Sequence, residues 1–284
     1  QPNIKREGIL AIIADFDGLV IRSKTQIDKC FLEKAIRLKF IARAGAGLDL
    51  IDLKLADEHN IQVFAANEGN KDAVAEHVLG MILCLLNHIN WSDQEVRNGI
   101  WLREENRGVE LKGMTVGILG YGNMGRALAQ RLRSFGVEIL AYDIDENIVF
   151  EDFVRKSTLE NIYEKTDILS IHLPLNSETK LLFDDQYLQN FKKNIFVVNS
   201  SRGEIVSLAT IKEGLVAGKI RGACLDVLEK EKFALLTDFE QKLYQELFSF
   251  KNTLFTPHVA GWTQESYVKI NDVLFSKIQS FLKN

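Results

Sequence analysis

Residues 114–125 read Met-Thr-Val-Gly-Ile-Leu-Gly-Tyr-Gly-Asn-Met-Gly, an apolar run that leads directly into a glycine-rich turn. The run predicts a buried strand, and we expect a helix to begin near Asn123. Gly120 permits the tight turn, Gly122 lets the backbone approach a diphosphate, and Gly125 lets the helix pack closely on the strand. Unpaired N–H groups at the start of such a helix, where its dipole is positive, bind phosphate oxygens. The stretch therefore predicts a dinucleotide-binding loop formed by Gly120, Gly122, Asn123, Met124 and Gly125.

An acidic residue after the next apolar run indicates which dinucleotide is bound. The predicted strand 138–142 is followed by Asp143, eighteen residues beyond Gly125. A carboxylate at this place accepts hydrogen bonds from the ribose hydroxyls of NAD and repels the 2′-phosphate of NADP. Asp145 is an alternative for the same role. We therefore expect NAD as the cofactor, with Asp143 as the first choice for the ribose contact.

The rest of the chain alternates short apolar runs with amphipathic stretches, which is typical of a parallel sheet covered by helices. Six runs have the length of buried strands, at residues 116–120, 139–143, 168–173, 195–200, 223–228 and 254–256. Three shorter strands are expected earlier, at residues 18–21, 40–42 and 63–65. The fold class is therefore α/β, with two doubly wound parallel-sheet domains. One is a Rossmann domain, and the other is smaller and flavodoxin-like.

Helical spacing appears between most of these runs. It predicts helices over residues 28–38, 52–58, 124–135, 208–217 and 239–248, and Ser207 is well placed to cap the fourth. A long helix with an apolar face is expected over residues 72–89. The following segment, 91–108, is polar with two tryptophans, and we interpret it as part of the crossing from one domain to the other.

Composition and charge exclude several classes of function. The net charge is −4, and basic residues form no cluster, which argues against nucleic acid or an anionic membrane as partner. The longest apolar run, Val78–Leu86, is far shorter than the roughly 20 residues that span a bilayer. The cysteines lie far apart, which favours a reducing, cytoplasmic location. No histidine has paired ligands nearby, so we expect no metal site. The chain begins at Gln1, and we expect further residues to precede it.

Polar side chains follow three consecutive predicted strands. Arg202 follows the strand at 195–200, two acidic groups lie at Asp226 and in the segment 229–231, and His258 follows the strand at 254–256. Because ligands bind at the carboxyl ends of the strands in such a sheet, we expect these groups near the dinucleotide. An arginine, a carboxylate and a histidine are the groups needed to hold an anionic carbonyl compound and to move a proton.

The order and spacing of these motifs resemble the D-isomer-specific 2-hydroxyacid dehydrogenases over essentially the whole chain. Besides the dinucleotide loop, the resemblance rests on Arg43-Ala-Gly-Ala-Gly-Leu-Asp49, on His172-Leu-Pro174, on the Arg202 segment and on Thr256-Pro-His258. It implies an oxidoreductase that transfers hydride between NAD and a small 2-hydroxy or 2-oxo acid. It also implies a substrate-binding domain at residues 1–71 and 261–284 and an NAD-binding Rossmann domain at residues 72–260.

The same resemblance implies the catalytic residues. Arg202 binds the carboxylate and the carbonyl of the substrate, His258 acts as acid and base, and Glu231 pairs with His258. Glu229 is an alternative partner, because Lys232 stands where relatives usually have proline. Further cofactor contacts are implied near the nicotinamide ribose and carboxamide, made by His172, Leu173, Pro174, Ser201, Asp226 and His258.

Substrate contacts are expected in the first domain. The glycine-rich turn holding Ala46 and Gly47 lets backbone N–H groups approach a carboxylate. Arg22 and Ser23 follow a predicted strand and resemble the corresponding stretch of D-3-phosphoglycerate dehydrogenases, where they suit a phosphate. A simple surface charge cluster is the alternative for that pair. The first substrate to test is 3-phosphoglycerate, and D-lactate, glycerate or hydroxypyruvate, and glyoxylate are alternatives.

Two further expectations concern assembly and class. The segment Trp91–Trp101 resembles the dimer-forming region of the family, which predicts a homodimer. The end at Asn284 predicts a short form without C-terminal regulatory domains. A protein of another class, an NAD(H)-sensing corepressor-like binding protein on the same fold, remains the alternative to an enzyme.

Overall fold

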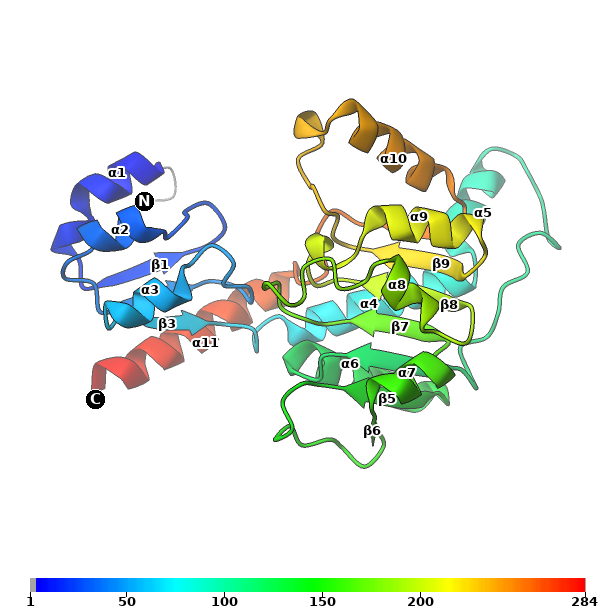
Figure 1. Cartoon of the computed structure of the whole chain (residues 1–284), viewed down its shortest axis with the longest axis horizontal. Helices are drawn as coiled ribbons and strands as arrows, with labels where there is room; N and C mark the ends of the chain where they lie inside the picture. Colours follow the sequence, from blue (N-terminus) through cyan, green and yellow to red (C-terminus); the bar gives the residue numbers. More distant parts are fainter. Residues whose placement is uncertain (1–3, 284) are drawn as a thin grey trace. The chain divides into compact units, whose positions relative to one another are not determined.

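The computed structural model describes residues 4–283, and the chain forms two compact units (Figure 1). The small unit comprises Gln1–Lys71 and Trp262–Asn284, and the large unit comprises Asp72–Gly261. Both units are built on parallel sheets with helices packed against them. The predicted α/β fold class is therefore confirmed.

The large unit is organised around a seven-stranded parallel sheet. Its strands are β4 (Thr115–Leu119), β5 (Glu138–Tyr142), β6 (Arg155–Lys156), β7 (Ile168–Ile171), β8 (Ile195–Asn199), β9 (Ile220–Leu225) and β10 (Thr253–Phe255). Their order in the sheet is β10-β9-β8-β7-β4-β5-β6. The chain starts at β4, runs outward through β5 and β6, and returns to the other side of β4 at β7. Ligands of such sheets bind at the carboxyl edge beside this reversal of order.

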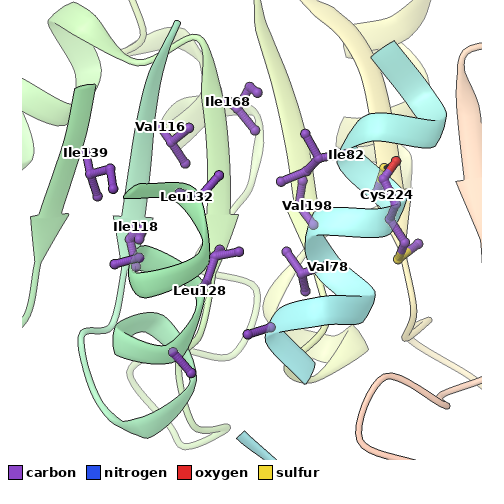
Figure 2. Packing of buried hydrophobic residues seen from close by; sticks show 14 of the residues in the cluster. Val78, Ile82, Val116, Ile118, Leu128, Leu132, Ile139, Ile168, Val198 and Cys224 are labelled. Atoms are coloured by element: carbon purple, nitrogen blue, oxygen red, sulfur yellow. Dashed lines mark hydrogen bonds between the residues drawn. The ribbon is translucent and has the colours of Figure 1, made fainter. Parts of the chain in front are cut away.

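Helices cover both faces of this sheet. One face carries α4 (Lys71–Leu86) and α6 (Asn123–Leu132), and the other carries α7 (Leu159–Lys165), α8 (Asp185–Gln189), α9 (Leu208–Val216) and α10 (Asp238–Ser249). Successive strand residues alternate between the two cores, so Val198 packs with the first group and Val197 with the second. Figure 2 shows the first core, where α4 and α6 pack on Val116, Ile118 and Val198. Each such side chain contributes about 1.5–3 kcal/mol on burial.

The small unit has a three-stranded parallel sheet in the sequential order β1-β2-β3. Its elements are α1 (Arg6–Ile12), β1 (Gly18–Ile21), α2 (Lys29–Lys34), β2 (Phe40–Arg43), α3 (Leu53–Glu58), β3 (Gln62–Ala65) and α11 (Gln264–Lys283). Ile270 and Leu274 of α11 pack on Ala42 and Ala66. A Cβ on Gly69 would lie 2.6 Å from the backbone nitrogen of Ile270, so α11 sits too close to admit a larger residue there.

The helix predicted over residues 72–89 is observed as α4, which ends at Leu86, and a second helix, α5 (Ile89–Arg97), follows it. His88 lies between them in the left-handed region, at a φ of 55°, which an α-helix does not admit. Among the described residues, no single helix is long and apolar enough to cross a bilayer. Only α4 and α5 taken together pass that test of length and composition, and a 60° bend separates them.

The interpretation of residues 91–108 as part of the crossing between domains is wrong. This segment lies entirely within the large unit, and the chain passes between the units at Lys71–Asp72 and Gly261–Trp262. Its first third continues α5, where the ring of Trp91 stacks on His88 with a centroid distance of 4.4 Å. Trp91 thus packs within the large unit, beside the start of α5. Trp101 follows the end of α5 and is 80% exposed.

Candidate active site

The predicted dinucleotide loop joins β4 to α6. A Cβ on Gly120, whose φ is 88°, would lie 2.5 Å from the carbonyl oxygen of His172, and a Cβ on Gly125 would lie 2.2 Å from the carbonyl oxygen of Gly120. Apart from its own neighbours in the chain, no described residue has an atom within 4 Å of the place where a Cβ on Gly122 would be. The outer glycines therefore serve the packing of the turn, whereas Gly122 leaves its backbone open to a ligand.

The start of α6 and Asp143 complete this loop. No side chain caps the first N–H groups of α6, which follow Gly122. Oδ2 of Asp143 accepts the N–H of Tyr121 at 2.6 Å, and Oδ1 accepts the N–H of Asp145 at 3.0 Å. The carboxylate of Asp145 instead accepts the N–H of Asn147. Asp143 thus lies against the loop, and each of its oxygens keeps lone pairs for ribose hydroxyls, so the loop fits a diphosphate and a ribose.

Tyr121, which could not be identified from the sequence as important, anchors the loop in the core. Tyr121 is fully buried, its hydroxyl donates to Glu151, and Phe150 stacks on its ring at 4.7 Å. Nη1 of Arg126 donates to the same carboxylate at 2.6 Å. Burial, together with the neighbouring carboxylate, raises the pKa of Tyr121, so the phenol stays protonated as a donor. Residues 144–154 are an irregular segment, and no periodicity in the sequence could reveal this contact.

Arg202 lies in the loop after β8, and Asn199 organises that loop. Asn199 is buried; its amide donates to the carbonyl of Arg202 at 2.9 Å, and its oxygen accepts both the N–H and the hydroxyl of Ser201. Nη1 of Arg202 donates to the carbonyl of Ser201 at 2.6 Å. The side chain of Arg202 therefore leaves from a loop whose backbone is fixed at several points.

His258 and Glu231 form a pair at the same edge of the sheet. Nδ1 of His258 lies 2.8 Å from Oε1 of Glu231, and both side chains are about half exposed. Oε1 of Glu229 accepts the backbone N–H of Leu208, at the start of α9, at 2.6 Å. The structure therefore brings Glu231, and not Glu229, to the histidine.

A buried carboxylate shapes the backbone around His258. Oδ1 of Asp226 accepts the Thr256 hydroxyl at 2.6 Å and the Val259 N–H at 2.9 Å, and Oδ2 accepts the Ala260 N–H at 2.9 Å. The carbonyl of Asp226 accepts the N–H of His258 at 2.7 Å. His77 of α4 adds a contact between its Nε2 and the Thr256 hydroxyl at 3.0 Å. Asp226 thus organises the loop that presents His258, a role that the sequence analysis did not foresee.

His172 is placed as a structural residue. Its Nε2 lies 2.8 Å from the hydroxyl of Ser170, and its carbonyl approaches Gly120. Burial lowers the pKa of His172 to about 4, so its ring is neutral near pH 7 and is not the imidazolium that an acid catalyst needs. Leu173 also lies against Gly120, within 3.1 Å of a Cβ placed there. Backbone contacts from this segment remain the expectation for the cofactor.

An apolar cavity of about 580 Å³ opens beside the His258–Glu231 pair. Its lining includes Phe233, Phe248 and Phe255, together with the pair itself, Asp226 and Thr256. The segment after Glu231, which departs from the common pattern of relatives, thus contributes Phe233 to the surroundings of the histidine.

The predicted substrate residues of the small unit follow two neighbouring strands. Arg22 and Ser23 come directly after β1, and the turn with Ala46 and Gly47 comes after β2. Because β1 and β2 pair in parallel to their last residues, both segments lie at the same edge of the sheet. The backbone N–H groups of Ala46 and Gly47 donate to no group within residues 4–283.

Comparison with known proteins supports the same assignment. Residues 79–260 match the model of the D-isomer-specific 2-hydroxyacid dehydrogenase NAD-binding domain, so NAD is the cofactor of this unit. The chain is 32% identical to the hydroxypyruvate reductase of Thermotoga maritima, over 97% of this chain and 88% of that protein. It is 30% identical to the D-3-phosphoglycerate dehydrogenase of Archaeoglobus fulgidus, over 100% of this chain and 53% of that one. The chain thus spans about half the length of the D-3-phosphoglycerate dehydrogenases it matches.

A solved structure agrees with these relatives. The D-lactate dehydrogenase of Aquifex aeolicus, in complex with NAD and lactic acid, superposes with a TM-score of 0.85 at 25% identity, covering 96% of this chain and 85% of that one. Its similarity extends over both units. The chain belongs to the D-isomer-specific 2-hydroxyacid dehydrogenase family.

Proposed function

We propose that this protein is an NAD-dependent D-2-hydroxyacid dehydrogenase, which interconverts a 2-hydroxy acid and the corresponding 2-oxo acid. The proposal is carried by the 2.8 Å contact between Nδ1 of His258 and Oε1 of Glu231. This pair follows β10 and β9, at the edge of the sheet that also holds the dinucleotide loop after β4. Bound NADH supplies the hydride in the direction of reduction.

His258 moves the proton. Because Glu231 engages Nδ1, the other ring nitrogen, Nε2, is left to donate a proton to the developing alkoxide and to accept it in the reverse reaction. Nε2 has no hydrogen-bond partner among residues 4–283. The carboxylate of Glu231 orients the ring and stabilises its cation. Arg202 offers a planar fork of donors to the carboxylate and carbonyl oxygens of the substrate.

The small unit provides the remaining contacts with the substrate. The N–H groups of Ala46 and Gly47 bind its carboxylate, and Arg22 with Ser23 binds a phosphate on the far carbon. This assignment favours 3-phosphoglycerate, and the relatives named for D-3-phosphoglycerate and hydroxypyruvate point to the same group of substrates. If Arg22 is only a surface charge and binds no phosphate, D-lactate and glyoxylate are the alternative substrates.

A panel of 2-oxo acids tests the proposal. Phosphohydroxypyruvate, hydroxypyruvate, pyruvate and glyoxylate are each offered with NADH and with NADPH, and the absorbance of the reduced cofactor is followed. We expect turnover of at least one acid, with NADH preferred because Asp143 repels a 2′-phosphate. A preference for NADPH would contradict the role of Asp143. A protein that binds NADH but reduces none of the acids would be an NAD(H) sensor instead.

We further propose a homodimer in the cytoplasm. The segment after α5 leaves Ile100 and Trp101 exposed, at 45% and 80%, next to Val96 at 53%, so an apolar surface is available for a second copy. Light scattering is expected to give twice the 32.2 kDa of this chain. Replacing Trp101 with glutamate should then shift the mass towards the monomer, and an unchanged mass would place the interface elsewhere.

A further inference from the structure

Arg22 is held by aromatic rings. Its Cζ lies 4.6 Å from the centroid of the Trp262 ring and 5.2 Å from that of the Tyr267 ring. Among residues 4–283, Arg22 forms no ion pair and no hydrogen bond, and its side chain is exposed. An arginine at the end of a strand is usually paired with a carboxylate or left to solvent, and this one is braced by two rings of the same unit.

The backbone that carries the two rings is fixed, although Trp262 and Tyr267 are themselves 63% and 53% exposed. Trp262 precedes α11 and Tyr267 lies in its first turns. Thr263 and Ser266 exchange hydrogen bonds, each backbone N–H donating to the other hydroxyl at 3.0 Å, which sets the start of the helix. Ser266 is buried, so this start is anchored in the small unit. A cavity of only about 30 Å³ remains between Arg22, the rings and Ala44, which precedes the anion-binding turn.

Stacking leaves the hydrogen-bonding groups of arginine available. The N–H donors of a guanidinium lie at its edge, and a ring contact is not a hydrogen bond to an oxygen, so these donors stay available to an anion. A carboxylate partner would occupy these donors and neutralise the charge. Arginine also loses about 2 kcal/mol of side-chain entropy when it is fixed. Rings that restrict the arginine side chain before an anion binds reduce the entropy that is lost on binding.

We propose that Trp262 and Tyr267 are positioning residues that hold the guanidinium of Arg22 ready for a phosphate monoester, and thereby set the preference for phosphorylated over unphosphorylated 2-oxo acids. The inference rests on the proposed function and deepens it. It concerns no catalytic residue, since the rings act only through Arg22. Trp262 could not be identified from the sequence, because an isolated tryptophan gives no spacing to interpret.

The test is the specificity ratio, defined as kcat/KM for phosphohydroxypyruvate divided by kcat/KM for hydroxypyruvate, both with NADH. Trp262→Leu and Tyr267→Leu are each expected to lower this ratio about 3- to 10-fold, mainly through KM for the phosphorylated acid. Trp262→Phe and Tyr267→Phe keep a ring and should restore most of it. Phe239→Leu, which removes a 77% exposed ring from α10 of the large unit, is the matched control and should leave the ratio unchanged.

A double-mutant cycle separates positioning from a general structural role. In an Arg22→Ala background, Trp262→Leu should have no further effect on the ratio, because the ring acts only through the arginine. An equal loss in that background, or an equal loss for both substrates, overturns the inference while the proposed function stands. A wild-type protein that reduces hydroxypyruvate without preferring the phosphorylated acid also overturns the inference and leaves the proposed function standing. A wild-type protein that reduces neither acid overturns the proposed function and the inference together.

Discussion

His258 is held by two acidic residues, one at its ring and one at its backbone. Glu231 engages Nδ1, while Asp226 binds the backbone of His258 and of the two residues that follow. His258 has a φ of 55°, a conformation that costs a non-glycine residue about 1–2 kcal/mol. The three hydrogen bonds to Asp226 offset this cost, so the direction of the imidazole is set by the loop.

Two neighbouring glutamates allow a matched test of the ring contact. Glu231→Gln keeps the size of the side chain but removes the charge that stabilises the imidazolium, so kcat should fall at least about tenfold, equivalent to about 1.4 kcal/mol. Glu229→Gln retains an oxygen for the N–H of Leu208 and should leave kcat unchanged. Steady-state kinetics of both variants decide the matter. Equal kcat values in the two variants would remove Glu231 from the mechanism.

His172 predicts a pH dependence of stability. Its pKa is lowered from 6.5 to about 4 by burial, so the unfolded chain binds a proton that the folded chain does not between these values. The free energy of unfolding should therefore fall as the pH falls from 6.5 towards 4, by about 3 kcal/mol. Denaturant unfolding across this range measures the effect. In His172→Asn the decline should be shallower by that amount, and an identical decline would contradict the assignment.

At the level of elements, the glycines of the turn between β4 and α6 have two different roles, in packing and in ligand binding. Gly125→Ala would place a Cβ 2.2 Å from a carbonyl oxygen and should destabilise the protein by about 1–3 kcal/mol. Gly122→Ala meets no described residue within 4 Å apart from its chain neighbours and should leave the melting temperature unchanged. It should nevertheless weaken NADH binding, because the backbone approaches the diphosphate there. Thermal melts and NADH titrations separate the two effects. Full NADH affinity in Gly122→Ala would show that the diphosphate lies elsewhere.

The strands and the main helices could be predicted because buried strands and amphipathic helices carry strong periodicities. The break at His88 could not, because a single residue with a left-handed backbone leaves no signal in the periodicity. The expected residues 208–217 agree closely with α9, which Ser207 caps through its hydroxyl. The helix α11 was not predicted as an element, although Tyr267 in α11 and Trp262 just before it contact Arg22.

At the level of the whole molecule, contacts between distant segments were the hardest to foresee. His77 meets Thr256 across 179 positions, and Trp262 meets Arg22 at the opposite end of the chain. Periodicity shows which face of an element is buried, but not which residue of another element it meets. Motif order located Arg202, Glu231 and His258 at one sheet edge, because parallel strands bring their carboxyl ends together. The contacts of Asn199 and Asp226 that organise the loops of Arg202 and His258 required the structure.

The central claim is that His258 transfers the proton while NADH reduces a 2-oxo acid. The most direct measurement compares wild type with His258→Asn for turnover of the best acid in the panel and for NADH affinity. The expected result is a loss of about 10²- to 10⁴-fold in kcat with unchanged NADH binding. Unchanged turnover in His258→Asn, or a wild-type protein that binds NADH and reduces no 2-oxo acid, would contradict the claim.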